Sequence, residues 1–97
     1  TINKETNGSA LTISLAGRLD TTTAPELEAE VKDALDGVEA LTFDFKDLAY
    51  ISSAGLRVLL TAQKTMNKQG KMTVTGASET VMEIFEVTGF VDILNIE

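Results

Sequence analysis

The 97-residue chain contains no cysteine, no histidine and only one proline. Without cysteine there is no disulfide framework, no thiol nucleophile and no thiolate metal site. Without histidine, the chain lacks the commonest general base near neutral pH, every serine–histidine catalytic pair and a frequent transition-metal ligand. An enzyme would have to use paired carboxylates, and the spacing of Asp20, Asp44 and Asp47 does not force any two together. We therefore predict no enzymatic activity, no metal and no cofactor.

Basic residues are also scarce, because 15 acidic residues face 8 basic ones and give a formal charge of −7. A net negative charge disfavours binding to the phosphate backbone of nucleic acids, so nucleic acid is not an expected partner. The same charge favours association with a basic protein surface. No apolar run approaches the ~20 residues that cross a bilayer, and the first residues do not resemble a signal peptide. We expect one cytoplasmic domain over residues 1–97, monomeric or weakly dimeric, with no membrane contact.

Apolar periodicity predicts an α/β fold. Strands of alternating character are predicted over residues 2–6, 10–16, 40–45 and 71–75, with a loop over 46–51 and a last strand or strand-like tail over 91–96. One helix is predicted to begin after Thr23, a second to span residues 53–69, and a third to begin after Ser78. This order implies right-handed crossovers and a mostly parallel sheet with helices packed on it, following an N-terminal β-hairpin.

Local signals mark the ends of these elements. Asn7-Gly8 is typical of a two-residue hairpin turn. Thr23 and Glu26 have the spacing of a capping box, with a proline in the first turn between them. Glycines at 37, 70 and 89 follow the three predicted helices, where a left-handed residue commonly ends the helix.

Two adjacent serines, Ser52 and Ser53, stand where the alternating pattern of a strand changes to helical spacing. One of them is expected to cap the helix by accepting a hydrogen bond from a free N–H group of its first turn. The same free N–H groups and the positive end of the helix dipole also favour an anion, including a phosphate on a serine. The serine that does not cap the helix is therefore available to carry a phosphate.

Other polar residues and one glycine allow two interpretations each. Asp20 and the threonines after it fit a metal or substrate site, but local hydrogen bonding in a turn is the favoured interpretation, and we predict no metal site. Gly55 fits either a close approach by a partner or tight packing of helix on strand. Arg18 and Arg57 can each pair with a carboxylate on this chain or on a partner.

The central stretch Asp47-Leu48-Ala49-Tyr50-Ile51-Ser52-Ser53-Ala54-Gly55-Leu56, preceded by Gly17-Arg18-Leu19-Asp20 and Ala24, resembles the STAS domain of bacterial anti-sigma factor antagonists. The resemblance extends to Gly76, Phe85 and Gly89. It implies that Ser53 is phosphorylated by a serine kinase that is also an anti-sigma factor. The unphosphorylated domain would bind this kinase and free the sigma factor, and a phosphatase would restore binding.

The chain departs from the family pattern at two positions. Ser52 stands where many members have aspartate, and Ala54 where many have a second serine or threonine. Ser52 is thus an alternative phosphate acceptor. The chain also ends at Glu97, where several members have a further helix.

Two functions are consistent with the resemblance. The first is the phosphorylation-controlled switch; the second is a non-switching adaptor that binds constitutively to a transporter, lipid-transfer or signalling complex, with its serine acting only as a cap. The residues predicted to bind the partner surround the two strand-to-helix junctions: Asp20, Thr21, Thr22, Ser52, Ser53, Ala54, Gly55, Leu56 and Arg57.

Overall fold

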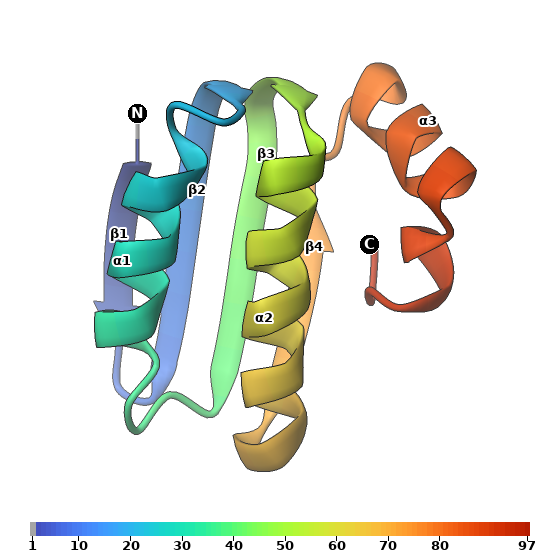
Figure 1. Ribbon diagram of the computed structural model, residues 1–97. Coiled ribbons are helices and arrows are strands. Elements are labelled where there is room, and N and C mark those ends of the chain that lie inside the picture. The colour runs from blue at the N-terminus through green and yellow to red at the C-terminus, as the bar shows by residue number, and fades with distance from the viewer. Residues whose placement is uncertain (1) are drawn as a thin grey trace.

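The computed structural model describes residues 2–97 as one sheet flanked by helices (Figure 1). The elements in order are β1 (Ile2–Asn7), β2 (Ala10–Leu19), α1 (Ala24–Ala34), β3 (Ala40–Ile51), α2 (Ser53–Gln69), β4 (Lys71–Thr75), α3 (Glu79–Thr88) and the 3-10 helix η1 (Phe90–Asp92). The predicted α/β class is confirmed, and α2 has the predicted bounds.

The sheet has the strand order β1-β2-β3-β4, with β1 antiparallel to β2 and the other neighbours parallel. Helices α1 and α2 lie side by side on one face, and α3 lies beyond β4 (Figure 1). Leu11 is paired with Leu41 and Ile13 with Phe43, so the buried side chains of both strands point to the helical face. The predicted alternation of β2 and the start of β3 is therefore confirmed.

The opening hairpin turns one residue later than predicted. Asn7 pairs with Ala10, which leaves Gly8 and Ser9 as the two turn residues. Gly8 has φ +63° and Ser9 has negative φ, a combination that suits glycine in the first turn position. Strand β2 also runs on to Leu19 beyond its predicted end.

The predicted loop over 46–51 is wrong, because β3 continues through these residues to Ile51. The pairing with β2 slips twice here, first between Ser14 and Ala16 and again between Gly17 and Arg18, and each time β3 uses one residue more than β2. Each such bulge breaks the two-residue period of a strand. After Phe45 the next buried side chains accordingly fall three residues apart, at Leu48 and Ile51, instead of two.

Of the two alternatives predicted for residues 91–96, a last strand is wrong, and only the end of the segment is strand-like. Gly89 adopts a left-handed conformation with φ +80° and ends α3, and the chain then forms η1. The tail makes a single parallel bridge between Ile96 and Val74, through the Val74 amide donating to the Asn95 carbonyl and the Glu97 amide donating to the Val74 carbonyl, both at 2.9 Å. The tail is thus held at the outer edge of β4 without extending the sheet by a full strand.

Three phenylalanines connect α3 to the core. The rings of Phe43 and Phe45 lie 5.8 Å apart, and Phe45 lies 6.4 Å from Phe85 of α3, with all three fully buried. Ser78 caps α3 as predicted, accepting a hydrogen bond from the Val81 amide at 3.2 Å. In residues 2–97 no helix combines the length and apolar character that crossing a bilayer requires.

Replacing Phe85 tests how strongly this packing stabilises the fold. We expect Phe85→Ala to lower the free energy of unfolding by about 3–5 kcal/mol, since it opens a cavity in the core. Val87→Ala on the same helix is the control, and because Val87 is 87% exposed it should change stability by less than about 0.5 kcal/mol. Urea unfolding measures both, and equal losses would contradict the assignment of Phe85 as the anchor of α3.

Candidate functional site

The two junctions singled out in the sequence lie at one edge of the sheet. Strands β2 and β3 are parallel neighbours, so their carboxyl ends, Leu19 and Ile51, are paired and each is followed by a helix. The Ser52 amide donates to the Leu19 carbonyl at 2.8 Å and holds the junctions together. Sites in parallel sheets commonly form at this edge, where strand ends meet helix N-termini.

Ser52 is the N-cap of α2. Its backbone is extended, with φ −95° and ψ 176°, and its Oγ accepts a hydrogen bond from the Gly55 amide at 3.4 Å. Its carbonyl accepts from the Leu56 amide at 2.9 Å. Ser52 is half-buried and satisfies a backbone donor of the first turn, which is the role expected of one of the two serines.

Ser53 is the first residue of α2, and its side chain is exposed. Within residues 2–97 its hydroxyl has no hydrogen-bond partner. The first turn of α2 contains no acidic residue, so no carboxylate of its own offsets the positive end of the helix dipole. Ser53 is therefore the accessible hydroxyl of the pair, at a position where an attached anion is electrostatically favoured.

Asp20 organises the turn between β2 and α1. Its Oδ1 accepts hydrogen bonds from the Thr22 amide at 2.9 Å and the Thr23 amide at 3.2 Å. The predicted capping box of Thr23 and Glu26 is absent: the Thr23 hydroxyl donates instead to the Arg18 carbonyl at 2.8 Å and accepts from the Asp20 amide at 2.9 Å. The Thr23 amide, which would donate to the Glu26 side chain in a capping box, donates to Asp20 instead, because the Asp20 side chain folds back over its own turn.

These contacts make Asp20 a structural carboxylate. The backbone N–H groups of Thr22 and Thr23 hold its pKa below the ordinary value, with a smaller contribution from Arg18, whose Nε lies 3.8 Å from Oδ2. Arg18 also covers the ring of Tyr50, with its guanidinium carbon 4.7 Å from the ring centroid. Local hydrogen bonding thus accounts for Asp20, and residues 2–97 contain no group of three or more potential metal-ligating side chains.

A hollow of about 300 Å³ lies between the starts of α1 and α2. Three residues predicted to bind a partner line it, namely Thr21, Ala54 and Arg57. The remaining lining residues, which sequence reasoning missed, are Ala24, Pro25, Glu28 and Val58. Helical spacing could have indicated two of them, because Glu28 follows Ala24 and Val58 follows Ala54 by four residues and therefore lies on the same face of its helix.

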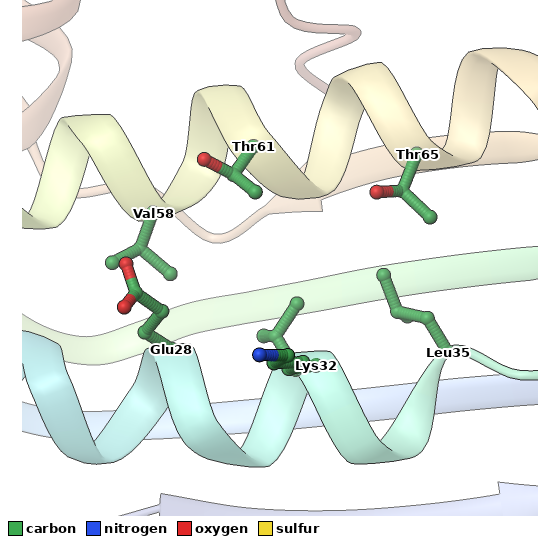
Figure 2. Close-up of a pocket in the computed structure, with 7 residues that line it drawn as sticks. Glu28, Lys32, Leu35, Val58, Thr61 and Thr65 are labelled. Carbon is green, nitrogen blue, oxygen red and sulfur yellow. The ribbon is translucent and has the colours of Figure 1, made fainter.

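The hollow continues into a groove of about 370 Å³ between α1 and α2 (Figure 2). Glu28 and Val58 line both. Figure 2 shows Val58, Thr61 and Thr65 of one helix facing the other helix. The opposite wall is formed by Glu28, Val31, Lys32 and Leu35. The groove therefore combines an apolar interior with one acidic and one basic side chain.

Two of the predicted contact residues, Gly55 and Leu56, lie inside the core. A Cβ atom added to Gly55 would meet Ile51 Cγ1 and Leu19 Cγ at 2.8 Å each. Of the two interpretations of Gly55, the structure supports tight packing of helix on strand. Gly55 positions the serines by letting the first turn of α2 approach the ends of β2 and β3.

Comparisons with known proteins place this geometry in a family. The sequence model of the STAS domain matches residues 1–97. The anti-sigma-B factor antagonist of Listeria monocytogenes is 32% identical over 97 residues, covering 97% of this chain and 84% of the relative. An anti-sigma factor antagonist from Mycobacterium paratuberculosis has the same fold, with a TM-score of 0.89 at 23% identity over 99% of this chain and 83% of that one. The Bacillus protein SpoIIAA in its phosphorylated form has a TM-score of 0.79 at 19% identity over 100% and 91%.

The close approach at Gly55 predicts a stability effect. Gly55→Ala should lower the free energy of unfolding by about 1–3 kcal/mol through overpacking, even though alanine is the better helix former. The neighbouring substitution Ser53→Ala is the control, with an expected change below about 0.5 kcal/mol because Ser53 is exposed and makes no cap. Thermal unfolding of the three proteins compares them, and a Gly55→Ala protein as stable as the parent would rule out the tight contact.

Proposed function

The chain belongs to the STAS domain family of anti-sigma factor antagonists, and we propose that it is a switch controlled by phosphorylation of Ser53. In its unmodified form it binds an anti-sigma factor that is also a serine kinase, and the sigma factor is released to direct transcription. Phosphorylation of Ser53 by this kinase abolishes binding, and a phosphatase restores it.

The observation that carries this proposal is the different placement of the two serines. Ser52 is half-buried and engaged by the Gly55 amide, whereas Ser53 is exposed and has no partner within residues 2–97. A kinase must reach a hydroxyl and leave the fold intact after transfer. Ser53 meets both requirements, whereas the Ser52 hydroxyl is half-buried and already engaged as the cap of α2.

The surface around Ser53 supports binding of a protein partner. Thr21, Ala54 and Arg57 line the hollow beside it, and the groove between α1 and α2 extends the same surface. Asp20 and Thr22 shape the turn next to the hollow through their hydrogen bond. The buried Gly55 and Leu56 contribute in this proposal by holding the exposed residues in place.

A phosphate at Ser53 would act by local charge and bulk. It adds about −1.5 to −2 charges at a helix N-terminus, where an anion is favourable by about 0.3–1 kcal/mol in exposed positions. The domain itself therefore has no reason to refold. A partner that packs apolar or acidic groups onto the hollow would instead have to bury an unpaired charge, which destabilises a complex by several kcal/mol.

Phosphorylation of serine variants tests the acceptor. Incubation with ATP and an anti-sigma factor serine kinase from the same organism should add one phosphate to the parent protein and to Ser52→Ala, but none to Ser53→Ala, as measured by intact-protein and peptide mass spectrometry. Ser52→Ala should also be less stable by about 1 kcal/mol because it loses the cap. A phosphate on Ser52 would overturn the assignment, and an unmodified protein that still binds the kinase would favour the non-switching adaptor.

The charge-mimicking variant Ser53→Asp tests the mechanism. We expect its thermal unfolding to match that of the parent, and its affinity for the same kinase in calorimetric titration to fall by about a hundredfold, or about 2.7 kcal/mol. Ser53→Ala, of similar size without charge, should bind as the parent does. Early unfolding of Ser53→Asp would place the effect on the fold, and unchanged binding would place Ser53 outside the interface.

A further inference from the structure

Helix α3 has apolar side chains on two sides. Val81 and Phe85 are fully buried in the core. On a neighbouring side, the half-buried Ile84, which also packs against the core, and the exposed Val87 line a hollow of about 230 Å³ together with Glu83 and Thr88. These four residues form what we term the α3 outer surface. An amphipathic helix of a globular protein normally presents one apolar stripe, to its own core, so the second stripe is available for contact with another molecule.

The α3 outer surface includes the most exposed large apolar side chain among residues 2–97. Val87 is 87% exposed, and Val91 and Ile93, in and just after η1, are 38% and 45% exposed. η1 packs against α3, so the exposed apolar groups cluster in one part of the molecule. Single exposed apolar residues are common, but a group of them next to a hollow indicates a contact surface.

The C-terminal quarter of the chain, which includes this surface, carries charges of only one sign. No lysine or arginine occurs after Lys71, whereas five acids do: Glu79, Glu83, Glu86, Asp92 and Glu97. All five are exposed, and the ion pairs found within residues 2–97 join only Lys4 to Glu30 and Arg18 to Asp20. Within residues 2–97, none of the acids of the C-terminal quarter forms an ion pair.

We propose that the α3 outer surface docks a basic amphipathic helix of another protein, whose apolar side covers Ile84 and Val87 and whose lysines and arginines face Glu83 and its acidic neighbours. Helices commonly bind through such apolar grooves. The acidic rim disfavours a second copy of this chain, which would bring like charges together, and equally an anionic lipid surface. A basic partner is attracted by the same charges.

This docking is separate from the proposed switch at Ser53. The hollow beside Ser53 is formed by α1 and α2, whereas α3 lies beyond β4, on the far side of α2 from α1 (Figure 1). A partner held on α3 therefore need not respond to a phosphate on Ser53. In this proposal the α3 outer surface binds its partner constitutively, whereas binding at the hollow beside Ser53 is regulated by phosphorylation.

A synthetic helical peptide with leucine on one side and lysine on the other serves as the probe, with a fluorescent label read by anisotropy. We expect Val87→Asp and Glu83→Lys each to weaken its binding at least about tenfold. Asp33→Lys changes the net charge as Glu83→Lys does, but on the exposed side of α1, and should change affinity less than about twofold, while Ser53→Asp should have no effect. The same peptide with glutamate in place of lysine should not bind.

Val87→Asp separates the proposal from attraction by overall charge. This variant makes the protein more acidic, so non-specific attraction would be kept or strengthened by it, whereas docking on Val87 is lost. Unchanged binding by Val87→Asp, an equal loss in Asp33→Lys, or a loss in Ser53→Asp would overturn the proposal. A dimer in sedimentation that Val87→Asp dissociates would show instead that a second copy occupies the surface.

Discussion

The arrangement of the site depends on one close contact, that of the first turn of α2 with the ends of β2 and β3. Gly55 permits it, because any Cβ at this position would enter the space of Leu19 and Ile51. The Ser52 amide, bonded to the Leu19 carbonyl, ties the same turn to the neighbouring strand. The orientation of both serines, and the hollow between the starts of α1 and α2, follow from this contact.

Charge has different roles in two regions of the molecule. At the start of α2 no acid of the first turn offsets the helix dipole, so an attached anion, such as the phosphate proposed on Ser53, is electrostatically favoured there. Around α3 the acids are permanent, form no ion pair within residues 2–97, and accompany exposed apolar side chains. The start of α2 is thus suited to reversible modification by a negatively charged group, and the α3 outer surface to permanent electrostatic attraction of a basic partner. Both belong to the same α/β domain.

Most of the fold could be predicted from local pattern, and the errors have identifiable physical causes. The bounds of α2 and the glycine and serine signals at the ends of α2 and α3 were predicted because they depend on nearby residues. The second half of β3 was missed because two bulges, set by pairing with β2, change its apolar period. The capping box did not form because the Thr23 amide donates to Asp20 and the Thr23 hydroxyl is bonded to the Asp20 amide and the Arg18 carbonyl. The strand predicted for the tail did not form because Gly89 ends α3 and the chain then enters η1.

By itself, the sequence determined that the chain lacks cysteine and histidine chemistry, that strands alternate with helices, and that two hydroxyls meet at a strand-to-helix junction. It did not determine which serine caps the helix, whether Gly55 serves a partner or the core, or that α3 has a second apolar side. Only the tertiary structure decided these, because each depends on a neighbour distant in sequence. Leu19 positions Ser52 and crowds Gly55, and Phe45 engages Phe85 and thereby leaves Val87 facing outward.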